Sequence, residues 1–153
     1  MRRLLFICSF LLLIAIACNK DKFQTKPRIE IKSYSSKIVP FNSAFIVNLN
    51  CFDKEGDVQD SLIIIKNRQN IRTVATIRDT LRYKFPVFPN NSTTEIQAIL
   101  DYQSILSAIN PPTIPGSNPP MKENDTLILR FAVRDKAGNT SDTIQSEPII
   151  VIR

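Results

Sequence analysis

The chain of 153 residues contains no histidine and no tryptophan. Without histidine it cannot build a Ser-His-Asp triad, a Cys-His pair or a zinc site with imidazole ligands. Long apolar runs are also scarce. The longest, over residues 4–16, is shorter than the roughly 20 residues that a membrane-spanning helix needs.

The residues around that run follow the pattern of a secretory signal peptide. Arg2 and Arg3 precede it, and the small residue Ala17 follows it, directly before Cys18. A short apolar run with charge at its start and a small residue at its end is typical of an export signal. The sequence therefore predicts a signal peptide over residues 1–17.

The segment AIAC (15–18) resembles the lipobox of bacterial lipoproteins. The resemblance implies cleavage before Cys18 and attachment of lipid, palmitate included, to its thiol. Two or three acyl chains would make a permanent anchor, whereas one chain binds a membrane only marginally. The start CNKDK (18–22) is similar to that of many Bacteroidetes lipoproteins. Asn19 is not the aspartate that retains enteric lipoproteins in the inner membrane, so we expect an outer-membrane location, facing either the periplasm or the outside.

Few cysteines and scattered charge limit the other possibilities. If Cys8 leaves with the signal and Cys18 is acylated, Cys51 is the one remaining thiol. Residues of 44–52 alternate so that Cys51 falls on the aliphatic face of a strand, where it acts as a small buried hydrophobe; a reactive thiol is the alternative. The net charge is +6, but the lysines and arginines are scattered along the sequence and do not cluster. Nucleic acid is therefore not an expected partner.

After a polar tether (18–27), alternating apolar residues predict one β-rich domain over 28–153. The expected strands cover residues 28–34, 44–52, 62–66, 71–77, 81–87, 126–134 and 143–152. Residues 95–109 fit both periods, and we interpret them as a strand over 95–101 followed by a helical turn near 103–109. The prolines of 110–120 exclude regular structure there.

The segment VRDKAGNTS (133–141) resembles the V-x-D-x-A-G-N-x-S closing hairpin of bacterial immunoglobulin-like domains. Residues 28–153 are also similar to a group of small Bacteroidetes lipoproteins with one such domain, in which an acidic loop follows the second strand. The resemblance implies an all-β, immunoglobulin-like antiparallel β-sandwich of seven or eight strands. It implies no established activity.

The acidic loop is the first candidate site. Its four carboxylates, within eight residues that turn at a glycine, are suited to Ca²⁺: Asp53, Glu55, Asp57 and Asp60. In an immunoglobulin-like order the loop 135–142 lies at the same end, so Asp135 and Asp142 are expected nearby. A plain turn, which also uses Asp and Gly, is the alternative. Apart from this Ca²⁺, no cofactor is expected.

A repeated Asp-Ser/Thr-aliphatic tripeptide is the second candidate. It resembles the O-glycosylation motif of exported Bacteroidetes proteins, which implies four candidate acceptors: Ser61, Thr80, Thr126 and Thr143. The alternative is structural, because Asp ends turns and Thr opens strands.

Together these patterns favour a non-catalytic envelope lipoprotein, held at the membrane by its lipid, that binds an envelope protein or glycan or serves structurally. The alternative is a small glycosidase-like hydrolase that uses carboxylates of the acidic loop. Such enzymes need two carboxyl groups roughly 5–10 Å apart across a cleft.

Overall fold

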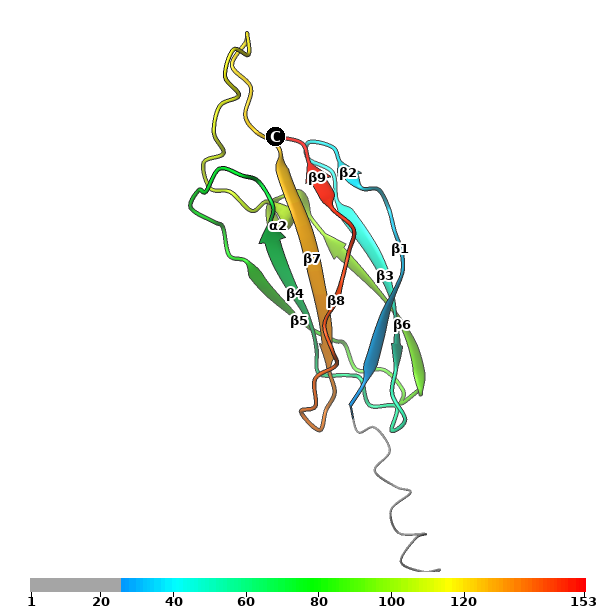
Figure 1. The fold of residues 1–153 in the computed structure, drawn as a ribbon. Coiled ribbons are helices and arrows are strands. Elements are labelled where there is room, and N and C mark those ends of the chain that lie inside the picture. The colour runs from blue at the N-terminus through cyan, green and yellow to red at the C-terminus, as the bar shows by residue number, and fades with distance from the viewer. Residues whose placement is uncertain (1–25) are drawn as a thin grey trace, which may run out of the picture.

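The computed structural model describes residues 26–153. The predicted signal peptide, Cys18 and most of the tether lie outside the described residues and stay predictions. The described part contains nine strands and one short helix, in two sheets (Figure 1). An all-β fold is therefore confirmed.

The first sheet has three antiparallel strands in the order β1-β3-β6: β1 (Arg28–Tyr34), β3 (Phe45–Phe52) and β6 (Thr93–Leu100). In β3, every second side chain is fully buried, including Phe45, Leu49 and Cys51. The predicted buried position of Cys51 is thus confirmed. This strict period of two is what a strand with one face in a core requires.

The second sheet runs in the order β2-β9-β7-β4-β5, with β8 paired to β7. Its members are β2 (Ile38–Val39), β4 (Ser61–Arg68), β5 (Thr80–Lys84), β7 (Asp125–Arg134), β8 (Ile144–Gln145) and β9 (Ile149–Val151). All pairs are antiparallel except β2 with β9, which is parallel. The expectation of a purely antiparallel fold was wrong at this edge.

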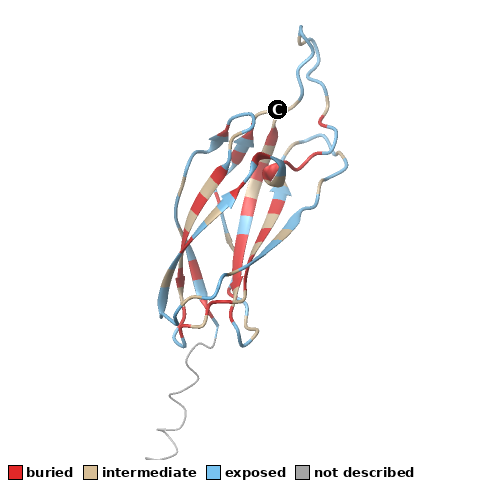
Figure 2. Ribbon diagram, turned by 180° about the vertical axis from the view of Figure 1, so that it is seen from behind, coloured by how far each residue is buried: buried red, intermediate tan, exposed pale blue. Residues whose placement is uncertain are grey.

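The core lies between the two sheets, where their apolar faces meet (Figure 2). Phe45 and Leu49 from the first sheet and Leu129 and Phe131 from the second are fully buried. Each such side chain contributes about 1.5–3 kcal/mol relative to an exposed position. This shared core gives the molecule its sandwich-like, two-layered form.

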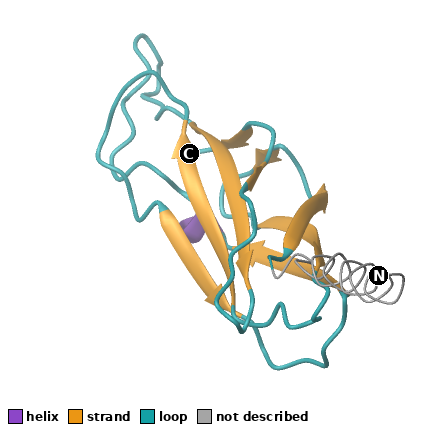
Figure 3. Cartoon of the chain, turned by 60° about the horizontal axis from the view of Figure 1, so that its bottom comes forward, coloured by secondary structure: helices purple, strands orange, loops and turns teal. Residues whose placement is uncertain are grey.

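Two segments differ from their sequence-based description, and a third agrees with it. Residues 71–77 form no strand; they are loop with one isolated bridge between Thr76 and Ala108, and Ile71 is exposed. The expected strand 143–152 is divided into β8 and β9 around Pro148, which cannot donate to a ladder. Residues 95–109 do form a strand and then a helical turn, α2 (Tyr102–Ile105), seen among the strands in Figure 3.

Two loops that are far apart in sequence meet at one end of the molecule. The β3–β4 and β7–β8 connections both lie at the lower end in Figure 1, where the described chain begins, whereas the C-terminus lies at the upper end. The backbone N–H of Lys136 donates to the carbonyl of Asp57 at 3.1 Å and joins the two loops. We refer to this end, defined by residues 53–60 and 135–139, as the acidic pole.

Candidate functional site

The β3–β4 loop is held by a tight turn around Asp53 and Gly56. The Gly56 N–H donates to the Asp53 carbonyl at 3.2 Å, and the Asp57 N–H donates to Asp53 Oδ2 at 3.0 Å. Gly56 has a φ of +72°, which glycine adopts without strain. The Asp53 side chain is thereby folded back into the loop, and the residue is only 4% exposed.

Asp135 reaches the same place from the end of β7. It is buried, and its two carboxylate oxygens accept from the backbone N–H of Asn139 at 2.7 Å and from Asn139 Nδ2 at 2.9 Å. One carboxylate oxygen each of Asp53, Asp57 and Asp135 lies within 4.8 Å of the others. We call these three residues the aspartate cluster.

The aspartate cluster concentrates negative charge in a partly dehydrated place. The pKa of the Asp57 carboxyl is raised, first by burial, then by its hydrogen-bond contact with the Asp53 side chain and by the charges of Asp135 and Asp53. Both burial and neighbouring like charge disfavour ionisation. The Oδ1 atom of Asp53 is buried and has no hydrogen-bond partner.

The other carboxylates of the predicted site lie elsewhere. Glu55 is exposed, and Asp60 Oδ2 accepts from the Ser61 hydroxyl at 2.9 Å. Asp142, expected near this end, is exposed and forms an ion pair with Lys26. The structure therefore brings together two of the four predicted ligands, Asp53 and Asp57, and adds Asp135.

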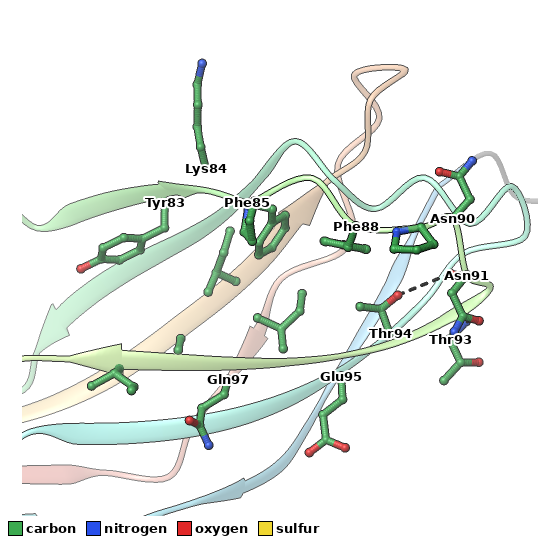
Figure 4. Close-up of a pocket in the computed structure, with 16 residues that line it drawn as sticks. Tyr83, Lys84, Phe85, Phe88, Asn90, Asn91, Thr93, Thr94, Glu95 and Gln97 are labelled. Carbon is green, nitrogen blue, oxygen red and sulfur yellow. Dashed lines mark hydrogen bonds between the residues drawn. The ribbon is translucent and has the colours of Figure 1, made fainter.

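A second candidate site is a groove of about 710 Å³ between the edge strands β5 and β6 (Figure 4). One wall is the segment 83–91, which carries the aromatic and proline residues; the other wall is β6. Tyr83 pairs in register with the buried Leu62, so it projects toward the first sheet, and Lys84 points away from the groove. The rings of Phe85 and Phe88 meet edge to face, with their centroids 6.3 Å apart.

The β6 wall is a strand edge rather than a strand face. Consecutive residues from Thr93 to Ile99 line the groove, although successive side chains of a strand point to opposite faces. In Figure 4, Glu95 and Gln97 extend on the far side of the strand. Within residues 26–153, β6 pairs only with β3, so its other backbone edge faces the groove.

Sequence reasoning did not single out this groove. The signal that was available is KFPVFPNN (84–91), where three large apolar residues and two prolines cover the end of the predicted strand 81–87 and the residues after it. Val87 is 94% exposed and Phe88 half-buried. Val87 does not line the groove, so the apolar surface of the groove on this side comes from its neighbours Phe85 and Phe88.

The four candidate glycosylation residues differ in exposure. Thr80 and Thr143 are exposed, Thr126 is half-buried, and Ser61 is 1% exposed. The folded chain therefore does not present Ser61 to a modifying enzyme. Ser61 and Thr80 each open a strand, whereas Thr126 is the second residue of β7 and Thr143 lies directly before β8.

No family model matches the chain, and no curated protein is significantly similar to it in sequence. Within residues 26–153, no helix is long and apolar enough to cross a membrane.

Proposed function

We propose that this protein is a cell-envelope lipoprotein, anchored through Cys18, whose domain is a non-catalytic binding module. The domain is an immunoglobulin-like β-sandwich, and the groove between β5 and β6 takes an extended polypeptide segment of an envelope protein. The observation that carries the proposal is the apolar groove that runs along the free edge of β6.

The anchor and the fold type are supported by independent features. The charge, length and small residue of the N-terminal segment support export and acylation. The two facing sheets, and the meeting of the β3–β4 and β7–β8 loops at one end, agree with an immunoglobulin-like arrangement. The outer membrane is the membrane that Asn19 favours.

A polypeptide suits this groove because a free strand edge offers backbone donors and acceptors to which another extended chain can hydrogen-bond. Added strands bind through main-chain hydrogen bonds, and pockets for alternate side chains give specificity. Here β6 supplies eight residues of edge, and the rings of Tyr83, Phe85 and Phe88 supply apolar surface beside it. We therefore expect a partner segment of about eight residues with apolar side chains at every second position.

Selection from a library of displayed eight-residue peptides tests the proposal. We expect enriched peptides to alternate apolar and polar residues. N-methylation of a bound peptide removes one backbone donor, so it should weaken binding at least about tenfold at alternate positions and have little effect between them. Binding is measured by fluorescence anisotropy with the full chain.

Two phenylalanine variants make a matched pair for this measurement. Phe88→Ala removes a ring from the groove and should weaken peptide binding. Phe41→Ala removes an exposed ring that packs on Tyr102, away from the groove, and should leave binding unchanged. Binding that is indifferent to N-methylation, or equal loss in both variants, would contradict strand addition; selective binding of glycans instead would change the class of partner.

The carboxylate-based hydrolase has less support. A glycosidase needs its two carboxyl groups on either side of a cleft, whereas the aspartate cluster gathers three ligand oxygens within 4.8 Å. In addition, the two oxygens of Asp135 are both engaged by Asn139. This arrangement is better suited to holding a cation than to transferring a proton.

A further inference from the structure

The aspartate cluster has no role in the proposed groove, which lies between β5 and β6. It is built from two loops that are about 80 residues apart in sequence, since Asp53 and Asp57 follow β3 and Asp135 follows β7. A turn explains only some of its bonds. Within the two turns, Asp53 Oδ2 accepts from the Asp57 N–H, and Asp135 Oδ1 accepts from the Asn139 N–H.

A turn does not explain the state of the second carboxylate oxygen of Asp53. Asp53 Oδ1 is buried without a partner in a residue that is only 4% exposed. Gln59 Oε1, in the same loop, is a second buried oxygen without a partner. Buried acceptors are normally paired, so each unpaired one calls for an explanation such as an ion or a water molecule.

The chemistry of the cluster selects a cation. Three carboxylates offer their oxygens within 4.8 Å of one another, and the like charges work against one another when no counter-charge lies between them. Ca²⁺ takes six to eight oxygen ligands, from carboxylates in one- or two-oxygen mode and from water, in flexible geometry. Mg²⁺ demands a stricter octahedron and gives up its water reluctantly.

We propose that Asp53, Asp57 and Asp135 bind one Ca²⁺ ion, with Asp53 Oδ1 among its ligands. The ion clamps the β3–β4 loop onto the β7–β8 turn and so fixes the acidic pole. The site reinforces the contact that Lys136 N–H already makes with the Asp57 carbonyl.

Calorimetric titration of the purified full chain with CaCl₂ tests this proposal, after removal of metal with EGTA. We expect one ion per chain with a Kd of about 0.1–1 mM, the range of extracellular Ca²⁺ modules. Because the ion binds the folded state, the melting temperature should rise with Ca²⁺ concentration. Mg²⁺ should bind more weakly.

A matched pair of variants separates the cluster from general charge in the loop. Asp57→Asn should weaken Ca²⁺ binding at least about tenfold and should keep its melting temperature in EGTA, because the Asp57 backbone makes the loop contacts. Glu55→Gln, an exposed position in the same loop, should bind as the parent does. Absence of binding at millimolar Ca²⁺, unchanged affinity in Asp57→Asn, equal loss in both variants or a preference for Mg²⁺ would overturn the proposal; in the first case a shared proton or water satisfies Asp53.

Discussion

Asp125 is fully buried at the start of β7 and binds four groups. Its carboxylate accepts from Arg153 Nη2 at 2.6 Å, from the backbone N–H groups of Ser107 and Ala108, and from Arg68 Nε at 3.5 Å. The side chains of Arg68 and Arg153 are themselves only 8% and 12% exposed, respectively. Asp125 thus holds the C-terminal residue, the segment after α2 and the end of β4 together.

We expect Asp125→Ala to lower the free energy of unfolding by about 3–5 kcal/mol, because it leaves the buried Arg153 guanidinium without its anion and leaves Arg68 with Glu123 alone. The control is Asp142→Ala, which removes an exposed partner of Lys26 and should have little effect, as exposed ion pairs contribute little. Urea unfolding of both variants measures the difference. Equal stabilities would show that the buried network contributes no more than the exposed pair.

Cys51 lies in the core, and burial raises the pKa of its thiol to about 12. Because the thiolate is the reactive form, iodoacetamide should fail to label native Cys51 at neutral pH and should label it in guanidinium chloride. The folded pKa lies above the unfolded one, so the contribution of this group to stability is present below about pH 9 and is lost between about pH 9 and 12.

A chain with Cys8 and Cys18 replaced by alanine isolates the Cys51 signal, and mass spectrometry reads it. Cys51→Ala in that background should reduce the loss of stability above about pH 9. Rapid labelling of the native protein would show that the strand opens far more readily than a fully buried position allows.

At the scale of elements, the β3–β4 loop depends on Gly56. A Cβ at this position would lie 2.9 Å from the Asn91 backbone nitrogen, and its φ is +72°. Gly116 has a similar φ of +76° but nothing within 4 Å of such a Cβ. Gly56→Ala and Gly116→Ala therefore share the backbone strain of about 1–2 kcal/mol, and only Gly56→Ala adds the clash.

We expect Gly56→Ala to be less stable than Gly116→Ala by about 1–3 kcal/mol, the usual range for overpacking against structure that cannot move away. Thermal unfolding of the two variants, side by side, measures this difference. If both lose the same stability, the loop around Asn91 yields to the added methyl group, and the close approach is not a constraint on the fold.

Strands with a clear period of two were predictable, and those set by distant partners were not. Alternation in Phe45–Phe52 and Asp125–Arg134 gave their faces correctly because each strand has one side in the core. The β-branched segment 71–77 has the composition of a strand, yet no neighbour pairs with it beyond one bridge, and strand propensity depends on such context. The two-residue strand β2 exists only through its pairing with β9, which local sequence does not encode.

The candidate sites likewise include residues that local sequence predicted and a groove that depends on distant pairing. Asp53 and Asp57 were predicted from their loop, and the approach of Asp135 followed from the expected order of strands. Asp60 and Glu55 fit the loop composition equally well but point elsewhere, because the turn at Gly56 decides which side chains fold inward. The groove was missed because it lies between the edge strands of the two sheets. That β5 and β6 are edge strands is set by pairing between segments far apart in the sequence.

For the whole molecule, the predicted anchor is the feature that places it in the cell. We expect Cys18→Ala to abolish metabolic labelling with palmitate and to release the protein from membranes, because we propose that its thiol is the point of lipid attachment. Cys8→Ala, within the predicted signal peptide, is the matched control and should stay labelled. A Cys18→Ala protein that remains labelled and membrane-bound would show that the anchor is elsewhere.

The position of β1 has a mechanical consequence. The described chain starts at the acidic pole and enters β1 directly, and β1 pairs with β3 from Arg28 to Tyr34, with one irregularity between Ile31 and Ser33 (Figure 1). A tether that pulls on the residue before Pro27, against a load held by the opposite end of the molecule, would draw β1 along its own axis. The backbone hydrogen bonds to β3 would then bear the force together, in shear, instead of opening one after another.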